Sequence, residues 1–264
     1  MQAVERGNSD IAERQRRHYD RIAELYAANL AYPHTQEYTR YLDGEYLSLL
    51  PAGRLGVVVE ICCGTGEAYA LVADRAEFAI GVDISLQMLK RAQARHPKLR
   101  LVQGDATRLP LREGLADVVL IHGGIHHVPD RIALFREVRR ILKPGGRFYF
   151  HEPADDFWLW RLIRKAIYRI SPSLDHTSEA PLRRESTTAE LSAAGLRPVA
   201  WNTRGFLGFC LFMNSDVLIF NRAFQYLPGI RALTRAACRL DHWMAGRPGL
   251  RNSGLIAVGA AERP

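Results

Sequence analysis

The amino-acid sequence predicts an α/β fold with a doubly wound, mostly parallel, seven-stranded sheet. Short apolar runs alternate with amphipathic segments from residue 57 to residue 151, which is the pattern of strands and helices in such a fold. The first run, VVVEI at 57–61, is nearly continuous in apolar residues, as expected of a strand buried on both faces of a parallel sheet. Glycines follow this run, where the chain must turn from the strand into a helix.

The other expected elements follow from the same patterns. Pro33 separates two N-terminal helices, and Thr188 is a candidate N-cap for a short helix near the end of the chain. The expected helices cover residues 9–30, 34–50, 66–75, 85–95, 130–142 and 187–194, and the expected strands cover 57–61, 78–82, 99–102, 117–121, 147–151, 196–201 and 254–260.

We expect a single domain, because no linker and no internal repeat divides the chain. We expect an N-terminal helical cover over residues 1–52 and a cofactor-binding core over 53–152. Two insertions, 153–186 and 204–250, are expected to form a helical lid, and two segments, 187–203 and 251–264, are expected to complete the sheet.

The composition is that of an ordinary globular protein. Hydrophobic residues make up 47% and charged residues 24% of the 264 positions, which excludes disordered and collagen-like classes. No apolar stretch approaches the roughly 18 residues of a membrane-spanning helix, and the first residues lack the apolar segment of a secretory signal. Four cysteines do not make a disulfide scaffold. We therefore expect a cytoplasmic location, with peripheral contact on the inner membrane face left open.

The formal net charge of +8 is unevenly distributed along the chain. Residues 1–152 hold 21 basic and 19 acidic side chains, and residues 153–264 hold 15 and 9, so the last part carries +6. A basic excess raises nucleic acid, anionic membrane and acidic substrates as partners.

Polar residues follow three successive strands of the expected sheet. They are the turn from Glu60 to Gly66, then Asp83, then Asp105. Ligands of such sheets bind at the carboxyl ends of the strands. A carboxylate at Asp83 can accept both hydroxyls of a ribose, and one at Asp105 can accept from an exocyclic amine such as that of adenine. Each aspartate alone could instead cap a turn, but the three strand ends together predict a site for adenosine.

The expected site is not that of a dinucleotide. Counting from Gly64 and Gly66, the third glycine of the dinucleotide fingerprint would fall on Tyr69, and the chain has no phosphate-binding P-loop motif. The turn is therefore better suited to a nucleoside without a pyrophosphate.

With these residues the chain resembles the class I S-adenosylmethionine-dependent methyltransferases, in particular the small-molecule type that includes ubiquinone and menaquinone biosynthesis enzymes. The resemblance covers about residues 16–152 and 187–201. It implies a Rossmann-like fold whose last strand is antiparallel. The segments that carry it are YDRIAELY (19–26), VVVEICCGTGEA (57–68), GVDISLQMLKRAQ (81–93), GDATRLPL (104–111), ADVVLIHGGIHHVPD (116–130) and REVRRILKPGGRFYF (136–150).

The resemblance implies S-adenosylmethionine as cofactor and assigns parts of it to residues. Many members have glycine where this chain has Cys62, whose side chain narrows the turn. The implied residues are Tyr19 and Tyr26 on a helix over the cofactor; Glu60, Cys62, Cys63, Gly64, Thr65 and Gly66 at the methionine end; Asp83 at the ribose; Ile84, Met88, Asp105 and Ala106 at the adenine; and His122 and Gly123 at the sulfonium side.

Histidines gather after the fourth and fifth expected strands. His126, His127 and Glu152 are the candidate catalytic residues, because a base is needed where the acceptor must lose a proton. Packing and loop capping remain alternatives for both histidines, and Glu152 could bind substrate or cap the following turn. We expect no metal site, because His122 and His126 are placed on a loop rather than on a helix.

Both insertions contain a candidate amphipathic helix with a basic polar face, over 157–170 and 230–244. In the second, Ile230, Leu233, Ala237, Leu240 and Met244 form an apolar stripe. We expect both helices to pack on the domain with their apolar sides inward. Contact with an anionic membrane or an anionic amphiphilic substrate is the alternative, and nucleic acid is not expected because no RNA-binding module is visible.

These observations predict transfer of a methyl group from S-adenosylmethionine to a small, partly apolar organic acceptor, such as a lipid, quinone, polyketide or glycosyl intermediate. An RNA or protein methyltransferase is one alternative. A protein that binds S-adenosylmethionine without methyl transfer is another. The sequence does not specify the oligomeric state.

Overall fold

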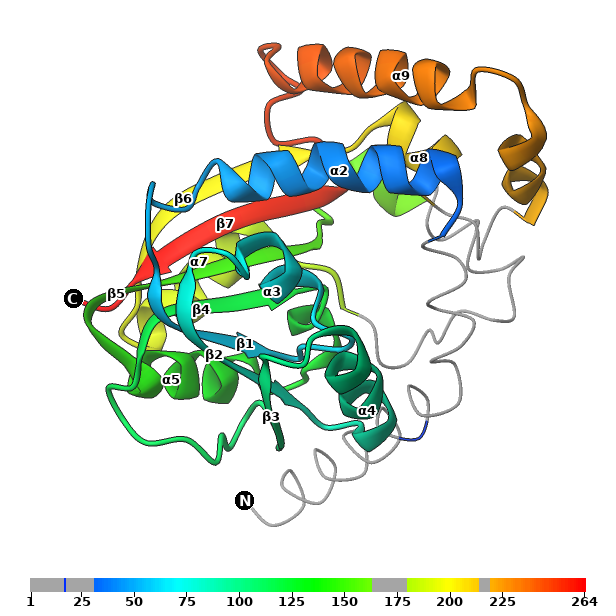
Figure 1. The fold of residues 1–264 in the computed structure, drawn as a ribbon. Coiled ribbons are helices and arrows are strands. Elements are labelled where there is room, and N and C mark those ends of the chain that lie inside the picture. The colour runs from blue at the N-terminus through cyan, green and yellow to red at the C-terminus, as the bar shows by residue number, and fades with distance from the viewer. Residues whose placement is uncertain (1–16, 18–30, 163–179, 214–218) are drawn as a thin grey trace.

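The computed structural model describes residues 17, 31–162, 180–213 and 219–264, which form one seven-stranded sheet flanked by helices (Figure 1). The strand order is β3-β2-β1-β4-β5-β7-β6, and β7 runs antiparallel to both of its neighbours while the other pairs are parallel. The predicted fold class, including the antiparallel last strand, is confirmed. The strands are β1 (Gly56–Ile61), β2 (Ala76–Asp83), β3 (Arg100–Gln103), β4 (Ala116–His122), β5 (Leu142–Pro153), β6 (Arg197–Arg204) and β7 (Ile256–Glu262).

The helices predicted within the described residues are found, with one error in a cap, whereas the short helices at 125–127, 207–212 and 219–226 were not predicted. The predicted helix over 9–30, apart from residue 17, lies outside the described residues, together with Tyr19 and Tyr26. So does the predicted helix over 157–170 beyond residue 162. Thr188 is not an N-cap, because α7 begins at Arg184 and the Thr188 hydroxyl donates back to the Arg184 carbonyl at 2.7 Å. The helices are α2 (Pro33–Leu47), α3 (Glu67–Val72), α4 (Leu86–Arg95), α5 (Arg131–Ile141), α7 (Arg184–Ala193), α8 (Leu207–Phe212) and α9 (Ile230–Ala245), with 3-10 helices η1 (Ile125–His127) and η2 (Ile219–Tyr226).

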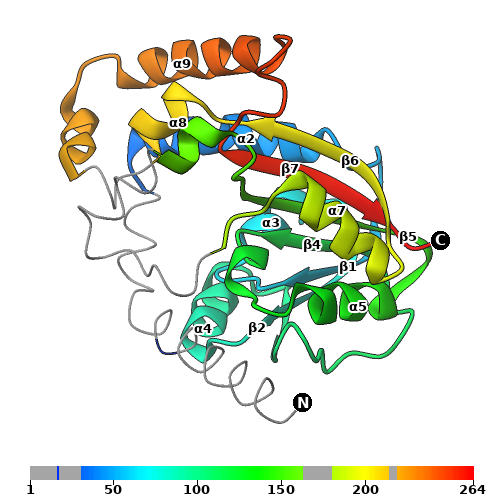
Figure 2. The same ribbon diagram turned by 180° about the vertical axis from the view of Figure 1, so that it is seen from behind.

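Helices cover both faces of the sheet, as a doubly wound fold requires (Figures 1 and 2). On one face, Phe135 of α5 and Leu191 of α7 pack into the core that contains Phe148 of β5. On the other face, Tyr46 of α2 packs into the core that contains Tyr149, the next residue of β5. Alternate residues of the same strand therefore belong to opposite cores.

A further helical layer lies over α2. Helix α9 packs on α2 and α8 (Figure 1). The fully buried carboxylate of Asp241 in α9 joins them, since it accepts the hydroxyl of Tyr38 at 2.5 Å and the amides of Phe206 at 3.0 Å and Gly208 at 3.2 Å. A buried carboxylate needs such partners, so these bonds determine which side of α9 faces inward.

The apolar stripe predicted for α9 is therefore wrong in two of its members. The helix buries Ile230, Thr234, Cys238, Asp241 and Ala245. Leu233 and Leu240 are exposed. The described part of the two insertions forms the layer over α2, and it does not establish a lid across the ends of the strands.

Candidate active site

The turn after β1 contains three residues with left-handed backbone. They are Cys62 (φ 53°), Gly64 (φ 51°) and Gly66 (φ 86°), and Cys62 is the only non-glycine residue with positive φ that the described chain shows. Such a conformation costs an ordinary residue about 1 kcal/mol. A Cβ atom added at Gly124 would lie 2.4 Å from the Cβ of Cys62. The side chain of Cys62 thus occupies space that glycine at position 124, in the loop after β4, leaves free.

Gly124→Ala should lower the free energy of unfolding by about 2 kcal/mol, because the new methyl group would overlap Cys62. Cys62→Gly removes the overlapping atom, so the same Gly124→Ala change should be much milder in a Cys62→Gly background. Urea unfolding of the four proteins measures this coupling. If the two substitutions lowered the free energy of unfolding additively, the side chains at positions 62 and 124 would not be in steric contact.

Glu60 at the end of β1 holds the start of α3. Its carboxylate is almost fully buried and accepts the amides of Ala68 and Tyr69, each at 2.9 Å. Burial, reinforced by the nearby charge of Glu67, raises the pKa of Glu60 to about 8. Both oxygens are engaged behind the glycine turn, so the structure shows Glu60 as a support of that turn.

Asp83 connects the end of β2 to the same turn. One carboxylate oxygen accepts the amide of Gly64 at 2.8 Å, and the other accepts the amide of Ser85 at 2.8 Å. Burial raises the pKa of Asp83, although these amide hydrogen bonds oppose the shift. Beside it, Ile84 is half-buried and Met88 is buried.

Asp105 follows β3 in a tight turn. Its Oδ1 accepts the amide of Thr107 at 2.7 Å and the Thr107 hydroxyl at 2.8 Å, and Ala106 is buried. Residues Asp83 and Gln103 are partners in the β2–β3 pairing. The two aspartates therefore lie at neighbouring strand ends, as predicted.

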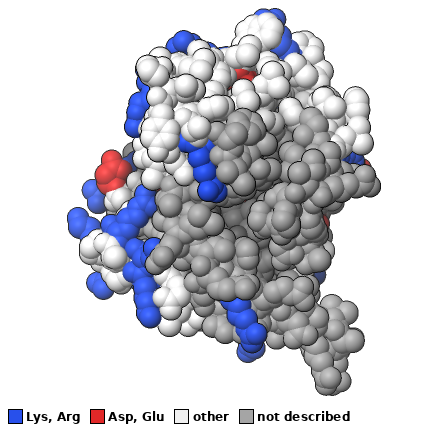
Figure 3. Space-filling view, turned by 90° about the vertical axis from the view of Figure 1, so that its right-hand side faces the viewer, with Lys and Arg blue, Asp and Glu red and all other residues white. Residues whose placement is uncertain are grey.

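This arrangement fits the adenosine part of a nucleoside cofactor. The Asp83 carboxylate accepts the amides of Gly64 and Ser85 on different oxygens, and a carboxylate has about four lone-pair sites, so acceptor capacity remains for ribose hydroxyls. No ion pair with either aspartate is found among the described residues. Figure 3 views the side of the molecule where the parallel strands end, and Lys and Arg gather along one margin of it.

Two stacked histidines close the strand ends of β4 and β5. His122 and His151 are partners in the β4–β5 pairing, and their rings lie 4.2 Å apart and 2° from parallel. Burial and the neighbouring His122 lower the pKa of His151 well below its ordinary value. Burial also acts to lower the pKa of His122, but Asp43 of α2, 3.7 Å from its Nε2, outweighs this and raises it. Any proton on this pair is therefore held by His122.

Glu152 organises the loop that carries His126. Its buried carboxylate accepts the amides of Gly124 at 2.7 Å and Ile125 at 2.8 Å. Its other oxygen lies 2.7 Å from Nδ1 of His126. This contact places the proton of a neutral His126 on Nδ1 and leaves Nε2 as an acceptor.

The neighbourhood of His126 includes the end of the first insertion. The Ala180 amide donates to the His126 carbonyl at 2.9 Å, and the His127 ring lies 3.8 Å from that of His126. No group of three or more metal-ligating side chains was found in a search of the described residues. None of the helices in the described part of the chain is long and apolar enough to cross a membrane.

Comparison with known proteins identifies the family. A family described as a methyltransferase domain matches residues 59–150. The ubiquinone/menaquinone biosynthesis C-methyltransferase UbiE of Rubrivivax gelatinosus is 31% identical over 176 residues, which cover 60% of this chain and 69% of that protein. The chain belongs to the class I S-adenosylmethionine-dependent methyltransferases. As a member of this class, the methyltransferase uses S-adenosylmethionine as its cofactor.

Two further comparisons concern the sequence and the fold. Demethylmenaquinone methyltransferase of Beutenbergia cavernae is 36% identical over 101 residues, covering 38% of this chain and 42% of that protein. A solved methyltransferase from Thermotoga maritima, described as a possible histamine N-methyltransferase, shares the fold with a TM-score of 0.63 at 20% identity, covering 93% and 98% of the two chains. The chain spans about half the length of the curated relatives that it matches.

Two residues at this site, Asp43 and Tyr46, were not predicted from the sequence. Both come from α2, where Asp43 faces His122 and Tyr46 lies edge-on to the rings of His122 and His151 at 6.0 and 6.2 Å. The helix was predicted, but only the packing of α2 across the sheet shows which of its residues reach the histidines.

Proposed function

We propose that the protein transfers a methyl group to a ring carbon of a small, partly apolar acceptor of the quinol type. The observation that carries this proposal is the contact between buried Glu152 and His126 Nδ1, because it prepares a base where the strands end. The names of the curated relatives, demethylmenaquinone methyltransferase and C-methyltransferase, support the acceptor class.

We propose that the cofactor lies along the ends of β1 to β4. Asp83 would accept the ribose hydroxyls, Ile84 and Met88 would flank the adenine, and Asp105 with the Ala106 amide would contact its edge. The backbone of 62–66 would hold the methionine end, with Glu60 supporting that turn through α3. His122 and Gly123 would face the reacting methyl group.

The cofactor and the protein have separate roles in the proposed reaction. The cofactor supplies an electrophilic methyl group. The chain must align the acceptor and remove its hydroxyl proton, which makes the ring carbon a better nucleophile. His126 Nε2 would take that proton, Glu152 would stabilise the resulting imidazolium, and His127 would bound the acceptor position beside the His126 ring. After the methyl group has bonded to the ring carbon, that carbon would lose its hydrogen as a proton to solvent and the ring oxygen would regain the proton from His126, so the aromatic quinol is restored and one proton is released overall.

The direct test is to incubate the purified protein with S-adenosylmethionine and a reduced demethylmenaquinone of short side chain. We expect a product that has gained one methyl group on carbon, identified by mass spectrometry and proton NMR. The same incubation with tRNA and with total cell protein should give no methylation. Binding of S-adenosylmethionine by calorimetry without any methylated product would instead favour a binding protein without methyl transfer.

A further inference from the structure

Large apolar side chains on the surface are concentrated in the two insertions. Of the 13 large hydrophobic residues that are exposed in the described chain, ten belong to residues 153–162 and 204–250. Monomeric proteins usually scatter such residues singly, and a local excess marks an interaction surface. The ten are Trp158, Leu159, Leu162, Leu207, Leu211, Tyr226, Leu227, Leu233, Leu240 and Trp243.

Helix α9 shows that this exposure is built into the fold. It turns Thr234 and Asp241 inward, while Leu233, Leu240 and Trp243 are 56%, 48% and 54% exposed. The hydrogen bonds of Asp241 hold the helix in this rotation. The apolar side chains on the outer side therefore have no partner in the chain's own core.

The exposed residues of the insertions come from segments that lie side by side. Trp160, Phe206 and Ala245 pack together in one buried cluster, which joins the helical turn at 158–162, α8 and α9. Figure 2 shows these three segments one above another on the side away from the sheet. We call their exposed residues the apolar surface: Trp158, Leu159, Leu162, Leu207, Leu211, Leu233, Leu240 and Trp243.

Positive charge accompanies the apolar surface. The guanidinium of Arg247 lies 4.1 Å above the ring of Trp243, and α9 also carries Arg239; no ion pair is found for either arginine in the described chain. Two further arginines of α9, Arg231 and Arg235, pair with Glu37 of α2 at 3.5 and 3.2 Å. The one acidic residue of α9, Asp241, is fully buried. In Figure 3 the upper part of the molecule, where α9 lies, is mostly uncharged, with isolated basic side chains and one small acidic patch. An outer face of this composition attracts anionic groups and not cations.

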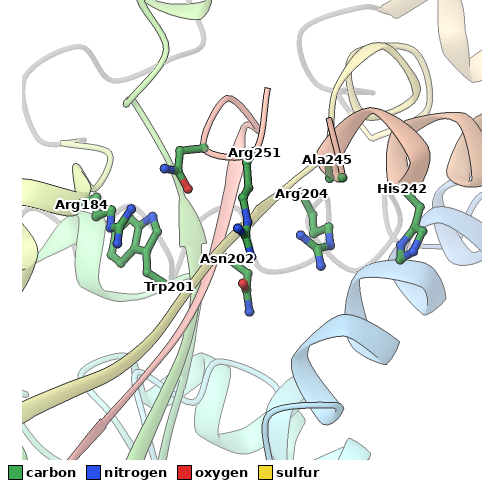
Figure 4. A pocket seen from close by; sticks show the side chains of 9 residues that line it. Arg184, Trp201, Asn202, Arg204, His242, Ala245 and Arg251 are labelled. Atoms are coloured by element: carbon green, nitrogen blue, oxygen red, sulfur yellow. The ribbon is translucent and has the colours of Figure 1, made fainter. Parts of the chain in front are cut away.

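A basic cavity lies at the C-terminal end of α9. Its volume is about 520 Å³, and Arg184, Arg204 and Arg251 line it together with His242 (Figure 4). No carboxylate lines it. Arg204 pairs with Glu45 at 2.8 Å, whereas no ion pair is found for Arg184 or Arg251 in the described chain. Such a set of guanidinium groups suits the phosphates of lipid headgroups.

We propose that the apolar surface docks on a bilayer that contains anionic phospholipids. Leucine and tryptophan side chains enter the boundary between headgroups and acyl chains, and the neighbouring arginines contact phosphates. The aliphatic character of the surface argues against nucleic acid, and the positive charge of Arg239 and Arg247 beside it argues against a second copy of the chain, whose arginines would repel them. Docking goes beyond methyl transfer, but it would bring the site to an apolar acceptor dissolved in the bilayer.

The test is sedimentation with phosphatidylcholine vesicles that either lack or contain about one third phosphatidylglycerol. We expect the wild-type protein to sediment with the anionic vesicles at low salt and much less at high salt. Leu240→Glu with Trp243→Glu should lower the partition coefficient at least about tenfold. Arg239→Gln with Arg247→Gln should lower it and reduce its dependence on salt.

Phe78→Glu is the matched control, because Phe78 is 46% exposed but lies on β2, outside the insertions. It should sediment like the wild type. All variants should bind S-adenosylmethionine like the wild type by calorimetry, so loss of docking is separable from loss of fold or of methyl transfer. Equal sedimentation of the Leu240→Glu, Trp243→Glu variant and the wild type would overturn the proposal. So would a wild-type dimer that this variant converts to a monomer, since a second copy would then cover the surface.

Discussion

Asp83→Ala should weaken binding of S-adenosylmethionine by about 100-fold. The substitution removes the two carboxylate oxygens that we assign to the ribose hydroxyls, and a hydrogen bond to a charged group contributes about 1.5 to 3 kcal/mol. It also releases the amides of Gly64 and Ser85, which the carboxylate holds at 2.8 Å each. Isothermal titration calorimetry of the purified variant measures the dissociation constant directly.

Asp117→Ala provides a matched control for this substitution. Asp117 also accepts a backbone amide, that of Val57 at 2.8 Å, and pairs with Lys143 at 2.7 Å, but it lies near the start of β4. Its loss should lower stability without changing the affinity for the cofactor. Asp83→Asn keeps one acceptor oxygen and should fall between the wild type and Asp83→Ala. If Asp83→Ala bound S-adenosylmethionine with wild-type affinity, Asp83 would only support the turn and would not contact the ribose.

The strands could be predicted because their signal is local. A buried parallel strand such as β1 must be apolar on both faces, so VVVEI is recognisable without knowledge of its neighbours. The positions of the glycine turn and of Asp83 at the ends of strands were predictable for a related reason. Parallel strands end at one edge of the sheet, so residues that follow successive strands meet there.

The orientation of α9 was not predictable from its periodicity. The inward face of this helix includes the polar residues Thr234 and Asp241, and its orientation depends on the hydrogen bonds of Asp241 with the hydroxyl of Tyr38 and the amide of Phe206. Tyr38 is 203 positions away in the sequence. A periodic pattern contains no information about such a distant partner, and a buried carboxylate outweighs two leucines when its hydrogen bonds are complete.

The roles of the polar site residues depended on contacts in the same way. Glu60 and Glu152 both follow apolar runs in the sequence, yet the structure uses one to hold α3 and the other to hold the loop at His126. The stacking of His122 on His151 follows from the β4–β5 register, which the sequence alone does not specify. The location of the site residues at the strand ends was thus predictable, whereas the hydrogen-bond or stacking partner of each side chain was not.

His126→Gln should lower kcat for a quinol-type acceptor by about 10² to 10³, the usual contribution of a general base. Glutamine preserves much of the side chain's bulk but cannot accept and carry the acceptor's proton. Because the cofactor contacts are proposed to lie at other residues, the dissociation constant for S-adenosylmethionine should stay near the wild-type value. Steady-state kinetics and calorimetry on the same preparation check both expectations.

Glu152 acts through His126 but also holds the loop, so substitution of Glu152 should lower stability whereas His126→Gln should not. Glu152→Ala removes the acceptor of the Gly124 and Ile125 amides as well as the His126 contact, and it should lower the free energy of unfolding by about 3 kcal/mol. His126→Gln leaves those amide bonds intact and should unfold near the wild-type midpoint. Full activity in His126→Gln would mean that no base at this position is needed, and alignment of acceptor and methyl group would then account for the rate.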